Sequence, residues 1–136
     1  MEKRILVVDD NVFVTKTAKM CLEGMGFMVE TLNSPFGVFS KMREFRPTLV
    51  LMDLNIPGLR GESIVRMLGQ KSFDFDYRVV IYSSESEGVL KDAVSSTGAF
   101  GYIKKDRPPL EFMQALEYYW RMCEDELIHS AKRVAI

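Results

Sequence analysis

Three aspartates stand directly after two strongly apolar runs of the sequence. Asp9 and Asp10 follow the first run, and Asp53 follows the third. Carboxylates placed side by side repel one another, and burying even one unpaired charge is costly. A hard divalent cation removes this conflict, because Mg2+ prefers carboxylate oxygens, a carbonyl and water as ligands. Asp10 or Asn11 could instead cap a helix, but acids behind two such runs favour a metal site.

Two further polar groups also follow apolar runs. Ser83, Ser84 and Glu85 come after the fourth run, and Lys104 and Lys105 end the fifth. A hydroxyl can donate to an oxygen of a bound phosphoryl group, and a lysine can pair with acids or with phosphate. Alone, these would be a turn serine and a solvated lysine pair. Together with the acids they favour a site that handles phosphate.

Five short apolar runs are the candidate strands that must position these side chains. They are Ile5–Val8, Met28–Leu32, Leu49–Met52, Val79–Tyr82 and Phe100–Ile103. The first, third and fourth are continuous and rich in Val, Ile and Leu, the pattern of strands buried on both faces. Apolar residues at helical spacing predict helices over 14–25, 34–45, 62–68, 89–96 and 110–127.

Alternating strands and helices predict a doubly wound, five-stranded parallel α/β sheet. In such sheets ligands bind beyond the carboxyl ends of the strands, near the switch in strand order. The acids, the serine and the lysines all stand at predicted carboxyl ends. We therefore expect them to meet at one edge of the sheet.

Composition narrows the class of protein. The 136 residues are 47% hydrophobic and 27% charged with a net charge of -1, which indicates a single globular domain. Five strand–helix units account for residues 1–120, so we expect the domain there and a helical extension over 121–136. The sequence has no basic stripe of the kind that binds nucleic acid, so we expect no direct nucleic-acid partner. No apolar run is long enough to span a membrane. Met1–Arg4 leads straight into a strand-like run without a signal peptide, so we expect a cytoplasmic protein.

The order and spacing of these residues resemble the receiver domain of bacterial response regulators over about residues 3–120. The matching elements are the acid pair Asp9-Asp10, then Asp53 with Pro57 and Gly61 behind it, then Ser83, and Tyr102 three residues before Lys105. The alignment selects Lys105 over Lys104. The resemblance implies a flavodoxin-like sheet with strand order 2-1-3-4-5, as in single-domain chemotaxis receivers.

The resemblance also implies a chemistry. Asp53 would take a phosphoryl group from a sensor histidine kinase, a phosphotransfer protein or a small acyl phosphate. Asp9, Asp10, Asp53 and the backbone carbonyl of Asn55 would hold Mg2+ or Mn2+. We expect no enzyme activity beyond the chain's own phosphorylation and dephosphorylation.

In the family pattern, further residues respond to the phosphoryl group. Lys105 and Ser83 would contact its oxygens, and Ser83 and Tyr102 would switch position. The face made by the fourth helix, fifth strand and fifth helix would then bind a downstream protein or a second copy of the chain. Asn55, Ser84 and Glu85 would tune hydrolysis.

Two positions depart from the family pattern, and two other functions stay open. Asp106 stands where proline usually follows the lysine, and Ser84 stands where Ala or Gly keeps the phosphoryl pocket open.

A pseudo-receiver would bind partners without being phosphorylated, although this chain keeps the acids and the lysine. A haloacid-dehalogenase-type phosphatase would need a second aspartate two residues after Asp53, where this chain has Asn55.

The predicted last helix carries three adjacent aromatic residues, Tyr118, Tyr119 and Trp120. Neighbours on a helix point about 100° apart, so the three cannot all face one core. At least one should be exposed, and exposed aromatic side chains are favoured anchors of interfaces.

Overall fold

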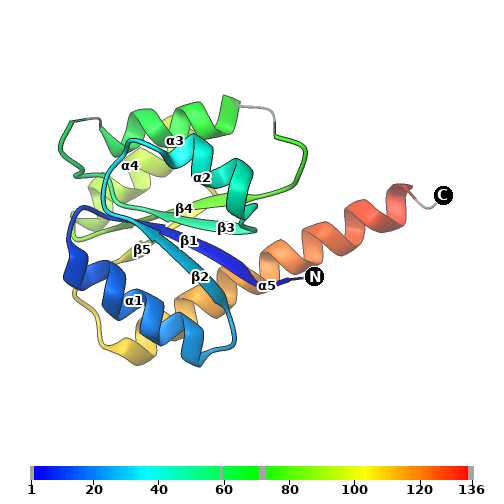
Figure 1. Cartoon of the computed structure of the whole chain (residues 1–136), viewed down its shortest axis with the longest axis horizontal. Helices are drawn as coiled ribbons and strands as arrows, with labels where there is room; N and C mark the ends of the chain where they lie inside the picture. Colours follow the sequence, from blue (N-terminus) through cyan, green and yellow to red (C-terminus); the bar gives the residue numbers. More distant parts are fainter. Residues whose placement is uncertain (1, 59, 71–72, 135–136) are drawn as a thin grey trace.

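Strands and helices alternate along the whole chain in the computed structural model, which describes residues 2–58, 60–70 and 73–134 (Figure 1). The strands are β1 (Arg4–Val8), β2 (Met28–Leu32), β3 (Leu49–Met52), β4 (Arg78–Ser83) and β5 (Gly101–Lys104). The helices are α1 (Val12–Gly24), α2 (Val38–Phe45), α3 (Gly61–Gln70), α4 (Glu87–Thr97) and α5 (Pro109–Val134). All strands pair in parallel in the order β2-β1-β3-β4-β5, which confirms the predicted sheet.

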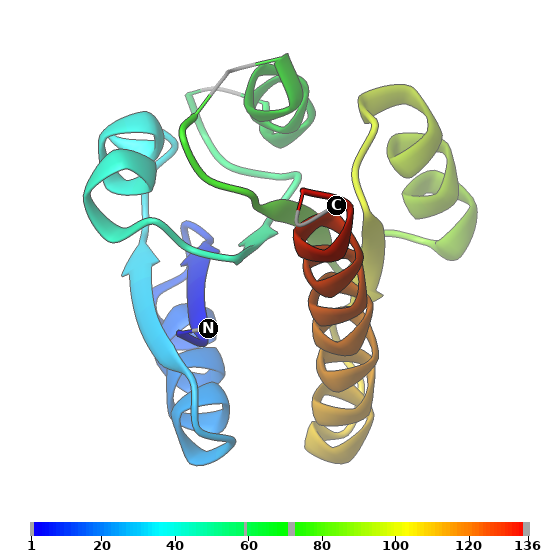
Figure 2. The same cartoon turned by 90° about the vertical axis from the view of Figure 1, so that its right-hand side faces the viewer.

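The sheet is a central layer with helices on both faces. Helices α1 and α5 cover one face, and α2, α3 and α4 cover the other (Figure 2). Side chains of β1 alternate between the two: Leu6 and Val8 join the core under α2, α3 and α4, whereas Ile5 and Val7 join the core under α1 and α5. Strands buried on both faces account for the continuous apolar runs.

Helix α1 begins where a side chain caps it. The Asn11 Oδ1 atom accepts hydrogen bonds from the backbone N–H groups of Phe13 and Val14, at 2.9 and 3.3 Å. Asn11 therefore does the capping that the sequence also allowed for Asp10. Asp10 is left free to serve the acid cluster.

Helix α2 starts four residues later than predicted. The expected start at residue 34 is wrong, because Gly37 adopts a φ of 88° and the helix begins only at Val38. That conformation interrupts a helix, and glycine adopts it without steric cost. Phe36 therefore lies before the helix and is 68% exposed.

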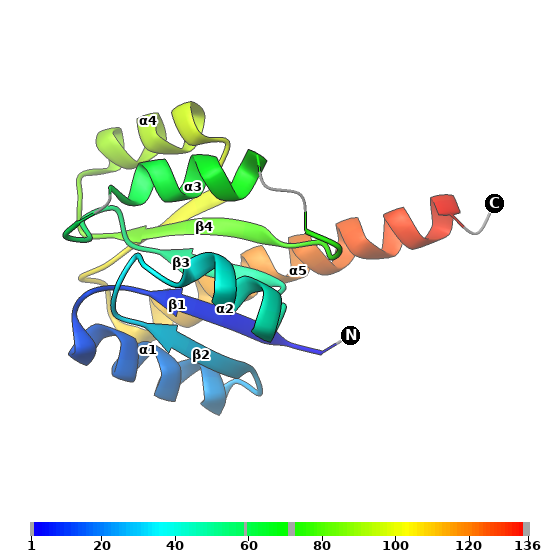
Figure 3. The ribbon, with the colours of Figure 1, turned by 45° about the horizontal axis from the view of Figure 1, so that its top comes forward.

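Helix α5 is a single helix of 26 residues that projects past the rest of the molecule (Figure 3). Its buried stripe includes Phe112, Leu116, Trp120 and Cys123. Tyr118 is 60% exposed, which confirms that the aromatic triplet cannot be wholly buried. The boundary drawn at residue 120 stays a prediction, and residues 135–136 lie outside the described part.

No described helix combines the length and apolar character that crossing a membrane requires.

Candidate functional site

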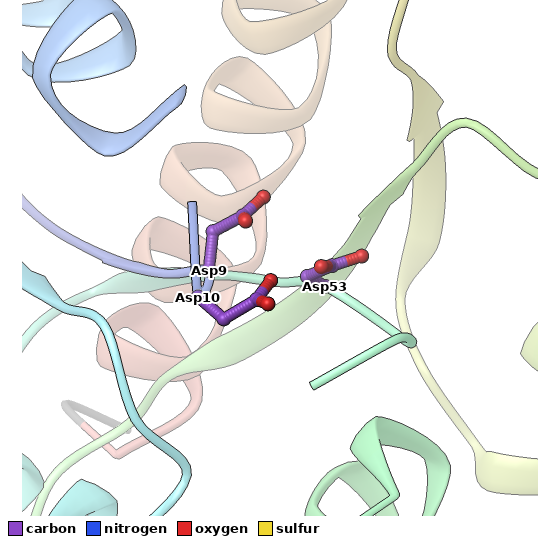
Figure 4. Close-up of side chains that lie close together, drawn as sticks. All are labelled: Asp9, Asp10 and Asp53. Atoms are coloured by element: carbon purple, nitrogen blue, oxygen red, sulfur yellow. The ribbon is translucent and has the colours of Figure 1, made fainter. Parts of the chain in front are cut away.

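The carboxyl ends of β1 and β3 bring the three acids together. Val8 pairs with Met52 in the sheet, so Asp9 and Asp53 leave neighbouring strands at the same level. The Asp53 N–H donates to the Val8 carbonyl at 3.0 Å. Carboxylate oxygens of Asp9, Asp10 and Asp53 lie within 4.8 Å of one another (Figure 4). The sequence prediction of one acid cluster is thus matched by the geometry.

Two of these acids are buried and one is not. Asp9 is 1% exposed and Asp53 is 5% exposed, whereas Asp10 is open to solvent. The Lys105 ammonium pairs with Asp9 Oδ2 and lies 3.5 Å from Asp53 Oδ1. Burial raises the pKa of Asp53; the nearby charge of Lys105 opposes that shift and the charge of Asp9 adds to it.

The donor set fits a hard divalent cation. Three carboxylates converge, and Lys105 is the one cation that pairs with them in the described part of the chain. Oxygen ligands with excess negative charge are the set that Mg2+ or Mn2+ takes. Asn55 belongs to the same loop, since its N–H donates to Asp53 Oδ1 at 3.3 Å. Its carbonyl stays a predicted ligand.

Ser83 ends β4 and is fully buried. Its Oγ accepts from the Glu85 N–H at 3.3 Å. Its carbonyl accepts from the Lys105 N–H at 2.8 Å, which ties the ends of β4 and β5 together. The serine and the lysine singled out in the sequence therefore share one corner of the site.

The three predicted hydrolysis-tuning residues lie on the rim. The Asn55 side-chain amide donates to Glu85 Oε1 at 3.2 Å, which joins the loop after β3 to the loop after β4. Ser84 is exposed. The Lys104 ammonium donates to the carbonyls of Ser84 and Glu85.

Tyr102, the predicted switch residue, is half-buried on β5. Its backbone N–H donates to the Tyr119 hydroxyl at 3.1 Å, and that hydroxyl donates to the Tyr102 carbonyl at 3.0 Å. The Tyr119 ring fits there because position 101 is glycine, where a Cβ would collide with it. Helix α5 is thereby attached directly to the backbone of Tyr102.

Sequence reasoning missed one residue that shapes the site. The Asn33 side-chain amide donates to the Asp9 carbonyl and to Thr15 Oγ1, both at 2.9 Å. These bonds fix the turn that carries the acid pair. Asn33 directly follows β2, so its place at a strand end was the available signal.

Gly61 was identified in the sequence by its offset from Asp53. The structure shows why this position requires glycine. A Cβ at this position would collide with the Asp53 carbonyl oxygen and with Leu54 Cα. The start of α3 can therefore approach the loop after β3 closely only with glycine there.

The family profile described as response regulator receiver domain matches residues 5–117. The chain belongs to the response-regulator receiver family. It is 31% identical over 126 residues to the DNA-binding response regulator MtrA of Mycolicibacterium paratuberculosis, covering 93% of this chain and 55% of that protein. It is 27% identical over 121 residues to the phosphate regulon regulator PhoB of Klebsiella pneumoniae, covering 89% and 53%. This receiver thus spans about half the length of those relatives.

Solved structures show the same receiver fold. The CheY-like receiver of Methanospirillum hungatei superposes with a TM-score of 0.81 at 21% identity, covering 93% of this chain and 99% of that one. The chemotaxis regulator CheY4 of Vibrio cholerae gives 0.77 at 22% identity, covering 87% and 98%. These superpositions show the fold, and the profile match and the curated relatives assign the chain to the response regulators of two-component systems.

Proposed function

We propose that this receiver is a phosphoryl-accepting switch and that Asp53 is the acceptor. The observation that carries the proposal is a buried Asp53 beside Asp9, Asp10 and the Lys105 ammonium. A buried carboxylate between a cation and a metal-binding acid pair can act as a nucleophile toward phosphorus.

The chain's own groups suit each part of the transfer. Asn55 and Lys105 both approach Asp53 Oδ1, so the other carboxylate oxygen is without a partner among the described residues and can attack. The new oxygen–phosphorus bond forms as the donor's phosphorus–nitrogen bond breaks, or its phosphorus–oxygen bond if the donor is an acyl phosphate. The histidine nitrogen or the acyl oxygen keeps the electron pair. Lys105 and Ser83 would donate to oxygens of the transferred group.

Asp9, Asp10 and Asp53, with the Asn55 carbonyl, would hold the divalent cation, which when bound neutralises charge on the phosphoryl oxygens. The Lys105 ion pairs with Asp9 and Asp53 already lower the repulsion inside the cluster. A sensor histidine kinase or a phosphotransfer protein is the expected donor.

The face of α4, β5 and α5 is the proposed readout surface. A groove of about 280 Å3 lies there, lined by Glu87, Tyr102, Ile103, Lys104, Arg107, Glu111, Phe112 and Ala115. Tyr102 connects this groove to the phosphoryl site, because β5 continues into Lys105. A downstream protein or a second copy of the chain would bind this face according to the state of Asp53.

Intact-mass measurement after incubation with acetyl phosphate and Mg2+ tests the proposal. We expect one phosphoryl group on the wild type and none on Asp53→Asn. The matched control is Asp92→Asn, which removes an exposed acid on α4 and should still accept the group.

The rival functions give different results. A pseudo-receiver would acquire no phosphoryl group under any condition. A phosphatase would turn over a small phosphate monoester many times per chain. Equal adducts on wild type and Asp53→Asn would exclude Asp53 as the acceptor.

A further inference from the structure

Lys104 has a specific pair of contacts that the proposed chemistry does not use. Its ammonium donates to two consecutive backbone carbonyls of the loop between β4 and α4, Ser84 at 3.2 Å and Glu85 at 2.9 Å. Strand β5 alternates in burial, so Tyr102 and Lys104 extend from the same, less buried side of the strand. The lysine left without a role by the family pattern thus links the readout strand to the rim of the site.

Glu85 is also held from the opposite side. Its carboxylate accepts from the Asn55 side-chain amide at 3.2 Å, and Asn55 itself donates from its backbone to Asp53. Contacts therefore run without a break from the acceptor loop through Glu85 to β5. We call this chain of contacts the Asn55–Glu85–Lys104 bridge.

The hydrogen bonds from Lys104 should strongly stabilise the observed position of the β4–α4 loop. Hydrogen bonds from an ammonium are about twice as strong as neutral ones. Residues 84–86 lie between β4 and α4 and have no helix or strand pairing of their own. Without Lys104, the placement of Glu85 would depend on its contacts with Ser83 and Asn55 alone among the described residues.

We propose that Lys104 is a positioning residue that holds Glu85 across the mouth of the site and so limits the access of water to phosphorylated Asp53. The hydrolysis role rests on the proposed function, whereas the loop-holding role does not. In the reaction it controls, water attacks phosphorus, the bond to the Asp53 oxygen breaks, and inorganic phosphate leaves. The structure thereby gives the readout strand a direct influence on the lifetime of the signal.

Hydrogen exchange of the unphosphorylated chain tests the loop-holding role first. We expect Lys104→Met to speed exchange of the Glu85 amide by about tenfold, the factor for losing about 1.4 kcal/mol of local stability. Lys104→Arg should restore much of the protection. The matched control Lys91→Met removes an exposed lysine on α4 and should change nothing in this loop. Unchanged exchange in Lys104→Met would overturn the proposal.

Decay of the phosphorylated chain, followed by intact mass, tests the hydrolysis role. We expect Lys104→Met to shorten the lifetime at least about threefold, Glu85→Ala to shorten it similarly, and the double variant to add little, because both act through one bridge. Independent, multiplying effects or an unchanged lifetime in Lys104→Met would overturn this role.

The two measurements separate the proposals. A wild type that never acquires a phosphoryl group would overturn the proposed function, and the hydrolysis role with it. The exchange result would still decide whether Lys104 holds the loop.

Discussion

Neighbouring lysines at the end of β5 do different work because consecutive strand residues point in different directions. Lys105 reaches the buried acids Asp9 and Asp53, whereas Lys104 reaches the carbonyls of the β4–α4 loop.

Asp106, the residue after the two lysines, differs from the family pattern in conformation as well as in type. Asp106 has a φ of 64°, in the left-handed region. Proline, which is usual there in the family, fixes φ near -65° and cannot adopt this conformation.

Replacing Asp106 with proline should therefore destabilise this chain. We expect Asp106→Pro to lower the free energy of unfolding by about 1–3 kcal/mol, the range for a residue forced from its native φ. Asp106→Asn should stay within about 0.5 kcal/mol, because asparagine tolerates the left-handed region. Urea unfolding of both variants measures the difference. Equal stability of the proline and asparagine variants would show that the loop accepts the usual family conformation.

Helix α5 shows how one element serves the core and the site together. Tyr119 bonds the backbone of Tyr102, while Trp120 is 3% exposed and packs edge-on against Phe27 with ring centroids 5.0 Å apart. The Trp120 indole N–H is buried without a hydrogen-bond partner among the described residues. Packing therefore stabilises the middle of the helix, and the unpaired N–H offsets part of that gain.

Two substitutions at Trp120 both remove the N–H and differ in how much packing they remove. Trp120→Ala should cost about 3–5 kcal/mol through the cavity it leaves. Trp120→Phe should cost no more than about 1.5 kcal/mol, because removal of the unpaired N–H offsets the lost volume. The chain has one tryptophan, so urea unfolding must be followed by circular dichroism. A loss of about 3 kcal/mol or more for Trp120→Phe would show that removal of the N–H does not offset the lost volume.

At the scale of the whole molecule, we expect metal binding at the acid cluster to raise the folding stability. Asp9 and Asp53 are buried with Lys105 as their partner, and Asp10 is exposed beside them. A cation that binds this cluster only in the folded chain must raise the folding stability. Because the acids come from β1 and β3, the effect reports on the assembled sheet.

Millimolar Mg2+ should raise the melting temperature of the wild type, and ethylenediaminetetraacetate should reverse the rise. At a concentration about 100-fold above the dissociation constant, the gain is about 2.7 kcal/mol. Asp10→Asn should show a much smaller shift, because one ligand loses its charge without leaving a buried group unpaired. Asp125→Asn, which changes an exposed acid on α5, is the control and should shift like the wild type. Equal shifts in all three proteins would contradict a site at the cluster.

The sequence by itself determined the parallel sheet, because continuous Val, Ile and Leu runs suit strands covered on both faces. It also located the acids, Ser83 and the pair Lys104-Lys105, since the carboxyl ends of parallel strands meet at one edge; the resemblance to the receiver family then selected Lys105 from that pair. Only the tertiary structure decided the late start of α2 and the partners of Lys104, Asn33 and Tyr119. Those contacts join residues far apart in the chain, so they depend on how helices and loops pack against the finished sheet and not on any local pattern.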